Sequence, residues 1–356
     1  MKNYKEKTIV SIVGIRPDFI RMSKIFKLLD KNFNHILIHT GQHFDKNLSE
    51  IYFNQLDIRT PDYNLNIGGF GKEHFHQNAE LSVKIIELFR NKNINPNLIL
   101  FLGDSNSVAC SVSLKKEGYI IGHIEAGMRS GDKRMLEEIN RIICDHCSDY
   151  LFVYHKNYKK KLLKENIKRD SIYVVGNTIV EVCKDFINQI TNNPKKNENI
   201  LLDIHRPENF KYKDRMEWII KYANMCYSKY KKPIRMLNFK RTIDQINKFN
   251  LNLQNIEIIE LMNYKEYLNF IYHCQFIISD SGTSQEEPAL LNTKVIVPRD
   301  FTERPESVDK NCSFMLNENN FESSLKWLDT DNKIDTKWLG KGKTSKQIIS
   351  IIKNVI

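Results

Sequence analysis

The chain has 356 residues, a formal net charge of +11, and 41% hydrophobic and 10% aromatic residues. This composition is typical of a soluble globular protein, and the length suffices for two domains that each bury a core. The lysines are spread over the whole chain without a basic arm or an aromatic-interleaved stripe, which argues against nucleic-acid binding. No apolar run reaches the roughly eighteen residues of a membrane span. We therefore expect neither a nucleic acid nor a membrane as a partner.

The seven cysteines lack the spacing of a disulfide framework, which is typical of a reducing compartment and predicts a cytoplasmic protein. Cys144 and Cys147 have the spacing of half a zinc site, but the chain has no second pair and structural zinc normally takes four ligands. We therefore expect no metal. The first apolar run ends in Gly-Ile-Arg-Pro-Asp rather than in small residues of a cleavage site, so it is interpreted as a strand and not as a signal peptide.

Apolar strand-like runs alternate with longer amphipathic stretches, which is the pattern of repeated βαβ units in an α/β protein. In the first half, strands are predicted at 8–13, 34–40, 98–103, 120–125, 150–153 and 171–175. Helices are predicted there at 19–30, 46–56, 78–91, 107–117, 136–147 and 157–165. A second set of strands is predicted at 200–204, 234–238, 256–260, 276–279 and 294–298.

The polar, asparagine-rich stretch 189–199 contains Pro194 and separates the two sets of strands, so it is the predicted linker. The sequence therefore predicts two doubly wound, Rossmann-like domains, at residues 1–188 and 189–340, with a cleft between them.

Three carboxylates follow predicted strands of the first half. Asp104 comes after the strand 98–103, Glu125 ends the strand 120–125, and Glu137 lies in the first turn of the next helix. Open α/β sheets bind their ligands at the carboxyl ends of neighbouring parallel strands. Carboxylates crowded at such a place raise each other's pKa and can serve as general acids and bases. The pattern therefore predicts proton-transfer chemistry.

Two turns of the first half carry groups suited to phosphate. Arg16 follows the first strand, where its planar guanidinium could bond phosphate oxygens, and Pro17 suits a first helical turn. A capped turn with a surface arginine explains the same residues equally well. The stretch Thr40-Gly-Gln-His43 after the second strand is a similar and weaker signal.

The stretch Ser279-Asp-Ser-Gly-Thr-Ser-Gln-Glu-Glu-Pro288 predicts a strand end followed by a helix start. Backbone N–H groups at such a start can bind a pyrophosphate, and Glu287 lies near enough to bond ribose hydroxyls. Arg299 and Arg304 follow the next strand and could approach the same phosphates. An ordinary N-cap with acidic residues near the helix dipole is the alternative.

His205 ends the first strand of the second half, flanked by Arg206 and Glu208. A histidine there can act near neutral pH as an acid, a base or a donor to phosphate, whereas a lone histidine is usually structural.

In this order, the motifs resemble the non-hydrolysing UDP-N-acetylglucosamine 2-epimerase family over nearly the whole chain. The resemblance is carried by Gly14-Ile-Arg-Pro-Asp18, Gly41-Gln-His43, Pro61-Asp-Tyr-Asn-Leu-Asn66, Leu102-Gly-Asp-Ser105, His123-Ile-Glu-Ala-Gly-Met-Arg129, Glu137-Glu-Ile-Asn-Arg141, Gly176-Asn-Thr178, His205-Arg-Pro-Glu208, Ser281-Gly-Thr-Ser-Gln-Glu-Glu287 and Thr302-Glu-Arg-Pro-Glu306. It implies the GT-B architecture, a final helix at 341–356 that returns to the first domain, and a homodimer.

The resemblance further implies a reaction without cofactor that inverts C2 of a UDP-linked N-acetylhexosamine. A base removes the C2 proton as UDP leaves C1 in an anti elimination, and the 2-acetamidoglycal takes UDP back after protonation from the opposite face. Asp104, Glu125 and Glu137 are implied as the acid/base groups, and His205 as support for the departing phosphate. The residues implied in UDP and substrate binding are Arg16, Arg21, Gln42, Arg129, Arg141, Arg206, Ser281, Gly282, Thr283, Glu287 and Arg304.

The chain departs from the family at three places, one of which is the stretch Phe44-Asp-Lys-Asn47 after Gly41-Gln-His43. The turn between Glu125 and Glu137 is shorter than in the N-acetylglucosamine enzymes and resembles the branch that acts on UDP-linked 6-deoxy-L-hexosamines, such as the L-fucosamine, L-rhamnosamine and L-quinovosamine types. Arg21 stands where the family usually has lysine. The sequence slightly favours a 6-deoxy-L-sugar. UDP-N-acetylglucosamine as the substrate, a hydrolysing relative that releases UDP, a GT-B glycosyltransferase, and a non-enzymatic nucleotide- or RNA-binding protein remain alternatives.

Overall fold

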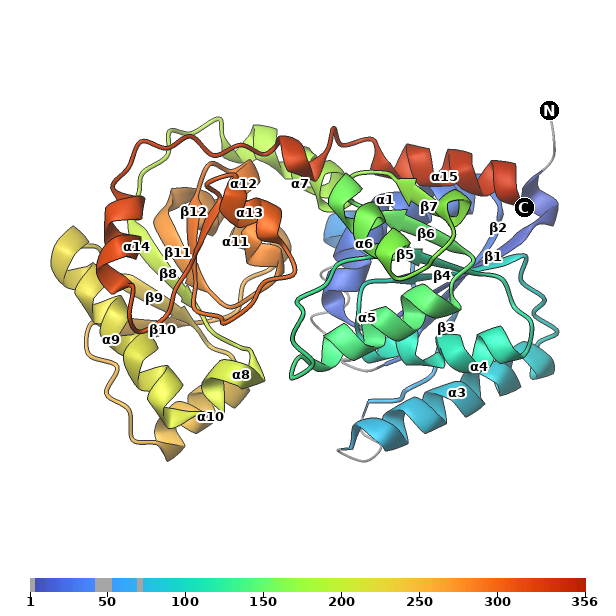
Figure 1. Cartoon of the computed structure of the whole chain (residues 1–356), viewed down its shortest axis with the longest axis horizontal. Helices are drawn as coiled ribbons and strands as arrows, with labels where there is room; N and C mark the ends of the chain where they lie inside the picture. Colours follow the sequence, from blue (N-terminus) through green and yellow to red (C-terminus); the bar gives the residue numbers. More distant parts are fainter. Residues whose placement is uncertain (1–3, 42–52, 69–72) are drawn as a thin grey trace. The chain divides into compact units, whose positions relative to one another are not determined.

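The computed structural model describes residues 4–41, 53–68 and 73–356. It divides into two compact units, which are Met1–Val182 with Leu339–Ile356 (unit 1) and Cys183–Trp338 (unit 2). Each unit is a parallel sheet with helices on both faces (Figure 1). The predicted α/β class with two Rossmann-like domains is therefore confirmed. The sequence placed the divisions after residues 188 and 340, whereas the units divide after Val182 and Trp338.

Within the described residues, unit 1 forms a seven-stranded sheet in the order β3-β2-β1-β4-β5-β6-β7, with every neighbouring pair parallel. Its strands are β1 Thr8–Val13, β2 Asn34–His39, β3 Tyr63–Asn64, β4 Leu98–Leu102, β5 Ile121–Ile124, β6 Tyr150–Val153 and β7 Ile172–Val174. Every residue of β4 and β5 is buried, as expected of strands covered on both faces, and β4 is a continuous apolar run whereas β5 contains His123.

The helices of unit 1 begin and end close to the predicted bounds where both can be compared. They are α1 Arg16–Asn32, α3 His74–Asn91, α4 Ser111–Lys116, α5 Leu136–Cys147, α6 Lys156–Lys164 and α15 Thr344–Val355, while α7 Ile179–Ile190 runs from unit 1 into unit 2. Short 3₁₀ helices are η1 Tyr4–Glu6, η2 Asn106–Cys110, η3 Arg169–Ser171 and η5 Lys337–Leu339. The predicted helix 107–117 is thus divided into η2 and α4. The predicted helix 46–56 lies mostly outside the described residues.

Unit 2 has a six-stranded parallel sheet in the order β10-β9-β8-β11-β12-β13. Its strands are β8 Asn199–Asp203, β9 Ile234–Leu237, β10 Ile256–Ile259, β11 Cys274–Ser279, β12 Lys294–Val297 and β13 Ser313–Met315. Its helices are α8 Pro207–Phe210, α9 Lys213–Tyr230, α10 Lys240–Lys248, α11 Tyr264–His273, η4 Thr283–Gln285, α12 Glu287–Leu290, α13 Pro305–Asp309 and α14 Phe321–Leu328.

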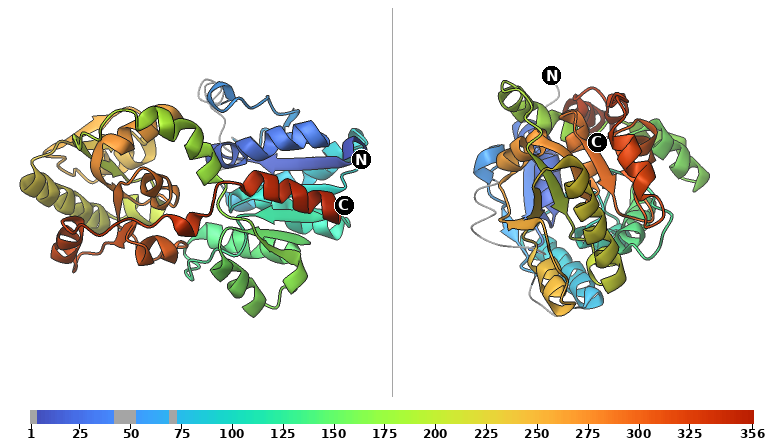
Figure 2. Two further views of the ribbon diagram at one scale, coloured as in Figure 1. Left: turned by 90° about the horizontal axis from the view of Figure 1, so that it is seen from above. Right: turned by 90° about the vertical axis from the view of Figure 1, so that its left-hand side faces the viewer.

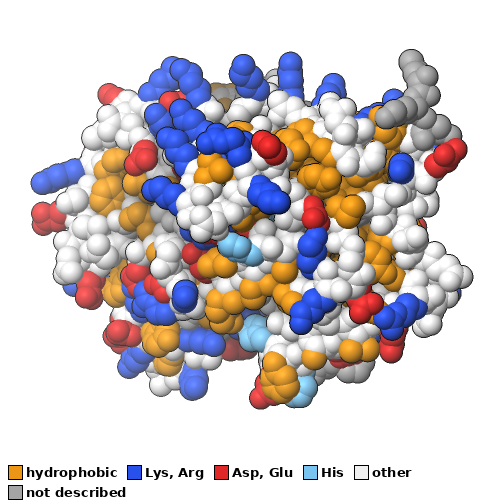
Figure 3. Space-filling view, turned by 45° about the vertical axis from the view of Figure 1, so that its right-hand side comes forward, with side chains coloured by type: hydrophobic (Ala, Val, Ile, Leu, Met, Phe, Trp, Pro, Cys, Tyr) orange, Lys and Arg blue, Asp and Glu red, His pale blue; other side chains and the backbone are white. Residues whose placement is uncertain are grey.

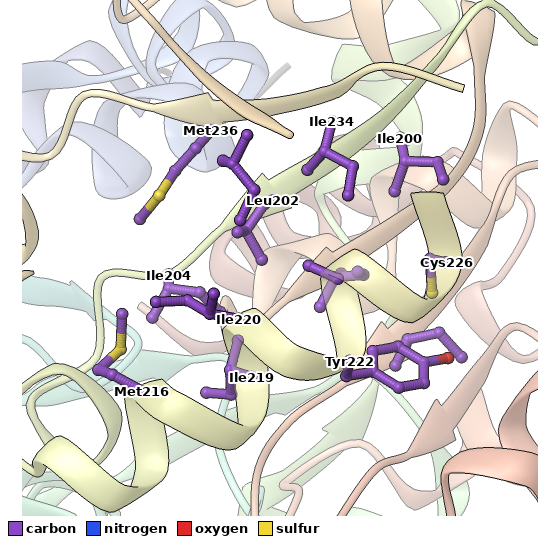
Figure 4. Packing of buried hydrophobic residues seen from close by; sticks show 14 of the residues in the cluster. Ile200, Leu202, Ile204, Met216, Ile219, Ile220, Tyr222, Cys226, Ile234 and Met236 are labelled. Carbon is purple, nitrogen blue, oxygen red and sulfur yellow. The ribbon is translucent and has the colours of Figure 1, made fainter. Parts of the chain in front are cut away.

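The core of unit 2 shows why these segments fold as they do. Leu202 of β8, Met236 of β9, and Ile219 and Tyr222 of α9 belong to one cluster of buried hydrophobic side chains (Figure 4). These α9 side chains recur at helical spacing and are fully buried. Burying each such side chain contributes about 1.5–3 kcal/mol, so this packing fixes the sheet from which the unit 2 site extends.

The C-terminal helix α15 belongs to unit 1 and lies beside α1 in both views of that region (Figures 1 and 2). Lys353 Nζ donates to Asn32 Oδ1 at 2.7 Å, and the Tyr150 hydroxyl donates to the Val355 carbonyl at 3.2 Å. The expected return of the last helix to the first domain is therefore confirmed. None of the helices in the described ranges is long and apolar enough to cross a membrane.

Each sheet reverses its strand order once, between β1 and β4 in unit 1 and between β8 and β11 in unit 2. Such topological switch points leave a crevice outside the carboxyl ends of the strands, where ligands of open α/β sheets bind. The residues after β1 and β4 are Gly14 and Gly103, and those after β8 and β11 are Ile204 and Asp280. Among the predicted site residues, Arg16, Asp104, His205 and Ser281 come within three residues of these strand ends.

Candidate active site

Two of the three predicted acid/base carboxylates meet at one arginine of unit 1. Asp104 follows β4, Glu125 follows β5, and Arg141 lies in the second turn of α5. Arg141 Nη2 forms an ion pair with Asp104 Oδ2 and lies 3.6 Å from Glu125 Oε1. The third carboxylate, Glu137, is half-buried one helical turn before Arg141. Residues four apart share a helix face, so α5 presents Glu137 and Arg141 on the same side.

Glu125 is held in an unusual conformation between two arginines. Its backbone has a φ of +69°, a left-handed conformation that costs a non-glycine residue strain and that proteins retain mainly at functional sites. Only 4% of Glu125 is exposed, and Arg21 Nη1 lies 3.2 Å from its Oε2. Burying a carboxylate requires compensating charge, which Arg21 and Arg141 provide from two sides. The site therefore combines a fixed acid with the cations that offset its charge.

Asp18, in the first turn of α1, is a site residue that the sequence analysis did not select. Its Oδ2 accepts the backbone N–H groups of Gly14 at 2.9 Å and Ile15 at 3.1 Å, and the Ser105 hydroxyl at 3.3 Å. Burial raises the pKa of Asp18 to about 7, although these hydrogen bonds oppose the shift. In a sequence, an acidic residue in a first helical turn is normally interpreted as a partner of the helix dipole. For this reason the sequence did not predict that Asp18 lies at the switch point.

A buried histidine supports the end of β4. His123 lies with Nδ1 2.7 Å from Asp145 Oδ1 and Nε2 2.7 Å from the Gly103 carbonyl oxygen. A carbonyl oxygen only accepts, so Nε2 carries a proton, and the carboxylate favours a proton on Nδ1 as well. Burial alone would lower the pKa of His123, but the neighbouring Cys144 and Asp145 side chains raise it well above its usual value. The residue before Asp104 is thus fixed by a buried imidazolium.

Arg129, an expected substrate ligand, is engaged within unit 1. Its Nη1 lies 2.7 Å from Asp145 Oδ2, and its Nε and Nη2 donate to the two carboxylate oxygens of Glu165 at 2.9 and 2.7 Å. These contacts tie the turn after β5 to α5 and to the residue that follows α6. Arg129 therefore stabilises the turn between Glu125 and Glu137.

The two neighbouring glutamates at the start of α5 have different surroundings. Glu138 is buried, and its carboxylate accepts the backbone N–H groups of Ser130 at 2.9 Å and Gly131 at 3.0 Å. It therefore closes the short turn that precedes α5, whereas Glu137 remains half-buried. The sequence singled out Glu137 by family resemblance, and nothing in the sequence alone separates the two roles.

In unit 2, His205 lies between two buried aspartates at the ends of β8 and β11. Its Nδ1 is 2.9 Å from Asp203 Oδ1, and its backbone N–H donates to Asp280 Oδ1 at 3.0 Å. Asp280 Oδ2 also accepts the backbone N–H of Arg206 at 3.1 Å. Burial lowers the pKa of His205, but the Asp203 carboxylate outweighs burial, and the pKa is raised above its usual value. The arrangement favours a cationic imidazole at the strand end.

The serine- and glycine-containing loop after β11 differs from the predicted helix start. It forms the 3₁₀ helix η4 first, and only then the four-residue helix α12. Ser281 Oγ and Thr283 Oγ1 lie 3.0 Å apart at the beginning of this loop. At Gly282, a Cβ would lie 2.7 Å from Arg304 Nη1, so the loop backbone approaches this arginine too closely for a side chain. Glu287 is buried, and its Oε1 accepts the Tyr264 hydroxyl at 2.8 Å.

Arg299 and Arg304 lie inside a network of ion pairs. Arg304 donates through Nε to Glu286 Oε1 at 2.7 Å and through Nη1 to Glu303 Oε1 at 3.1 Å. Arg299 Nη1 donates to Glu303 Oε2 at 3.0 Å. Both arginines are almost fully buried. Their charges support the loop around Gly282 through these ion pairs, and their expected approach to phosphates stays a prediction.

The remaining predicted ligands occupy the strand ends or cannot be placed. Arg16 is partly exposed at the start of α1, and Arg206 is partly exposed directly before α8. Gln42 lies outside the described residues. Within residues 4–41, 53–68 and 73–356, no group of three histidine, cysteine or acidic side chains is arranged to hold a metal ion.

A family model described as UDP-N-acetylglucosamine 2-epimerase matches residues 27–353. The chain belongs to this family. The epimerase is 36% identical, over 96% of this chain and 97% of its relative, to UDP-N-acetylglucosamine 2-epimerase of Methanococcus maripaludis. It is 32% identical to UDP-2,3-diacetamido-2,3-dideoxy-D-glucuronate 2-epimerase of Pseudomonas aeruginosa, over 84% of this chain and 85% of that protein.

Solved structures agree with this assignment. The crystal structure of Methanocaldococcus jannaschii UDP-GlcNAc 2-epimerase in complex with UDP-GlcNAc and UDP matches with a TM-score of 0.89 at 32% identity, over 98% of this chain and 99% of that chain. The epimerase is thus an isomerase of the non-hydrolysing type, as its sequence motifs predicted.

Proposed function

We propose that the epimerase inverts C2 of a UDP-linked N-acetylhexosamine by eliminating UDP and adding it back. In the first step the C2–H bond breaks, its electrons form the C1–C2 double bond, and the C1–O bond to UDP breaks. In the second step C2 is protonated on the opposite face and a UDP oxygen bonds to C1. The convergence of Asp104 and Glu125 on Arg141 carries this proposal, since it places two acids at the switch point of a family member.

In this proposal the carboxylates of unit 1 exchange the C2 proton. Inversion requires proton transfer at both faces of C2, so one group cannot serve as both the base and the opposing acid. Asp104, Glu125 and Glu137 are the candidates. Arg21 and Arg141 position Glu125 and offset its charge, and Arg129 acts through the turn rather than on the substrate.

The residues at the switch point of unit 2 are proposed to bind UDP. With Nδ1 of His205 directed at Asp203, Nε2 carries the second proton of the imidazolium and can donate to a phosphate oxygen as negative charge develops on the leaving UDP. Glu287, fixed by Tyr264, is the proposed ligand of the ribose hydroxyls. The further proposed ligands of UDP are Arg16, Gln42, Arg206, Ser281, Gly282 and Thr283, while Arg304 supports the loop from within its ion-pair network.

The test is incubation of pure protein with a panel of UDP-N-acetylhexosamines in deuterated water. The expected result is one solvent deuterium at C2 of the epimerised product, and deuterium also in recovered substrate once the reaction approaches equilibrium. Net release of UDP with a free sugar would show a hydrolysing enzyme, and UDP release that depends on an added acceptor would show a glycosyltransferase. The absence of C2 exchange with every UDP-sugar of the panel would overturn the proposal.

For the sugar, we propose UDP-N-acetylglucosamine as the first candidate, because the 36% identical relative over nearly the whole chain carries that name. The second candidate is a UDP-linked 6-deoxy-L-hexosamine derivative, which the short turn between Glu125 and Glu137 favours. Comparing kcat/KM for UDP-N-acetylglucosamine with that for UDP-N-acetyl-L-rhamnosamine and UDP-N-acetyl-L-fucosamine decides between them. A ratio above about 100 in either direction identifies the sugar that the site accepts, since it corresponds to about 2.7 kcal/mol of transition-state binding.

We also propose that the epimerase is a cytoplasmic homodimer. All seven cysteines lie in the described residues and carry free thiols. On α5, Leu136, Ile139 and Ile143 are exposed and share one helix face, and exposed Val112 and Phe75 belong to α4 and α3. Hydrophobic side chains also gather among the charges on the face shown in Figure 3. Grouped exposed apolar residues mark interfaces in soluble proteins.

Light scattering of the wild type and of Ile139→Glu tests the dimer. The expected result is a dimer for the wild type and a monomer for the variant, because a buried charge at a self-complementary face is repeated on both copies. Lys213→Glu, at an exposed residue at the start of α9 in unit 2, is the control and should remain a dimer. A monomeric wild type at micromolar concentration would contradict the proposal.

A further inference from the structure

The chain returns from unit 2 to unit 1 at Leu339, and the returning segment is received by residues 175–177. The backbone N–H of Asn177 donates to the Leu339 carbonyl oxygen at 2.8 Å. Thr344 Oγ1 donates to the carbonyl oxygens of Val175 at 3.0 Å and Asn177 at 3.3 Å. At Gly340 a Cβ would lie 3.0 Å from Gly176 Cα, so the two backbones approach each other closely. The place of return is therefore well defined in unit 1.

The Asn177 side chain extends from this place to the acid/base site. It is 1% exposed, and its Oδ1 accepts the backbone N–H of Ile179 at 3.0 Å and Arg21 Nη1 at 3.2 Å. The same Nη1 atom of Arg21 lies 3.2 Å from Glu125 Oε2. Arg21 Nη1 therefore donates a hydrogen bond to the amide oxygen of Asn177 and forms an ion pair, not a hydrogen bond, with the carboxylate of Glu125. One nitrogen of Arg21 thus joins Asn177 to Glu125.

We propose that Asn177 is a positioning residue that holds the Glu125 carboxylate in place through Arg21, from the segment that receives the returning chain. The inference rests on the proposed function. Arg21 has a long side chain with several rotatable bonds, and Asn177 restricts it to the rotamer that meets Oε2. The backbone N–H of Ile179 fixes the amide of Asn177. The position of Glu125 is therefore restrained through the side chains of Asn177 and Arg21. Nothing in this chain of contacts involves a residue outside unit 1.

Loss of the amide oxygen has a specific consequence. In Asn177→Ala, Arg21 keeps its charge next to Glu125 but loses the acceptor that directs Nη1, so the pair can settle into other geometries. Misplacement of a reacting group by about 1 Å can reduce a rate on the order of 100-fold. We therefore expect kcat to fall 10- to 100-fold in Asn177→Ala, with KM changing less than about 3-fold, because UDP binding is assigned to other residues.

Two variants separate positioning from simple loss of packing. Asn177→Asp keeps an oxygen at the position of Oδ1, so it should recover most of the kcat lost in Asn177→Ala. Thr344→Val removes a hydroxyl from the same receiving segment without touching Arg21, so it should lower thermal stability while kcat stays within about 2-fold of the wild type. Crystal structures of the variants give a readout that does not need turnover. Arg21 and Glu125 should be displaced in Asn177→Ala and unmoved in Thr344→Val.

The experiment is therefore steady-state kinetics and crystallography on the wild type and these three variants. Displacement of Arg21 with a kcat loss confined to Asn177→Ala, and its recovery in Asn177→Asp, would support the inference. Equal kcat in Asn177→Ala and Thr344→Val, or an unmoved Arg21 in Asn177→Ala, would overturn it. A wild type without epimerase activity would contradict the proposed function, and the crystal structures would still decide the inference. If Asn177→Ala does not fold, the crystal structure of Asn177→Asp decides the inference. A displaced Arg21 in that variant would overturn the inference.

Discussion

The topological switch points of the two units have the same kind of backbone turn but differ in the side chains around it. In unit 1, Asp18 accepts the backbone N–H groups of Gly14 and Ile15 after β1, and in unit 2, Asp280 accepts those of His205 and Arg206 after β8. A buried carboxylate thus fixes the turn after the first strand of each sheet. In unit 1 it comes from the helix that follows this strand, and in unit 2 from the end of the neighbouring strand β11.

The surroundings of these two turns differ in charge in the way that the two proposed tasks require. Unit 1 adds carboxylates and arginines in nearly matched numbers, so acids are held close together without excess charge of one sign. Unit 2 adds a histidine whose raised pKa favours the cation beside a loop of small residues. The first arrangement suits proton exchange, and the second suits a leaving diphosphate. The comparison teaches that the added side chains, rather than the shared sheet order, distinguish the tasks.

The largest expected effect is loss of the unit 1 acids. Asp104→Asn and Glu125→Gln should each lower kcat by about 1,000-fold or more, because an amide cannot accept or supply the C2 proton. The affinity for UDP should stay within about 3-fold, since neither carboxylate is among the proposed ligands of UDP. Turnover by nuclear magnetic resonance and UDP titration calorimetry measure the two quantities. Glu117→Gln, an exposed residue paired with Arg90, is the control. Near-normal turnover in both variants would refute the assigned roles.

The next effect concerns the cation of unit 2. His205→Asn should lower kcat about 100-fold and weaken UDP binding, because the imidazolium donor to the leaving phosphate is lost. The pKa of His205 is raised, so its charge is present below that pKa and disappears as pH rises through it. The affinity of the wild type for UDP should therefore fall as the pH rises through this raised pKa, whereas that of the variant should fall less. Parallel pH profiles of the two proteins would contradict this assignment.

A smaller effect is expected at Gly282. In Gly282→Ala the new Cβ would meet Arg304 Nη1, so the loop or the buried ion-pair network must shift. We expect UDP to bind about 10-fold more weakly, which corresponds to about 1.4 kcal/mol. The pKa values of the unit 1 groups and the proton transfer itself should be unaffected, so deuterium exchange at saturating substrate should remain near the wild-type rate. Unchanged UDP affinity would exclude a role for this loop.

The last effect is on stability rather than on activity or UDP affinity, and it concerns Asp18. Its pKa of about 7 lies above that of an aspartate in an unfolded chain, so between about pH 4 and 7 the folded protein holds a proton that the unfolded chain has released. This residue therefore lowers the free energy of unfolding as pH rises through that window, by up to about 1.4 kcal/mol per pH unit. In Asp18→Asn this contribution should vanish, because an amide does not titrate. The fold should be kept, because Oδ1 of the amide can accept the same N–H groups. Denaturant unfolding of both proteins at several pH values measures the difference, and identical slopes would contradict it.

Much of the fold follows from the sequence because buried parallel strands are continuous apolar runs. The strands Thr8–Val13 and Tyr150–Val153 and the helix Leu136–Cys147 match their predicted bounds. The strands β3 and β13 have two and three residues, too few for a hydrophobic period to be recognised. The division of 107–117 into η2 and α4 depends on local hydrogen bonding rather than on the apolar pattern.

The candidate site was less predictable because its arginines depend on distant partners. The sequence places Arg304 near the loop around Gly282, but it does not show that Glu286 and Glu303 enclose its charge. In the same way, Arg129 belongs to a family motif, and only the folded chain brings Asp145 and Glu165 to it. Asp18 reads as an ordinary acidic residue of a first helical turn. The family motifs identified the region, and the contacts show that Arg129 and Arg304 are paired with acidic side chains.

The central claim is that C2 inverts while the bond between C1 and UDP is broken, and isotope scrambling tests it most directly. A UDP-N-acetylhexosamine with ¹⁸O in the oxygen that bridges C1 and the β-phosphate is incubated with the epimerase in deuterated water. The account predicts that recovered sugar nucleotide carries deuterium at C2 and has its ¹⁸O distributed among the β-phosphate oxygens, because free rotation follows departure of UDP. Epimerised product with the label still in the bridge and with C2 free of deuterium would contradict the account.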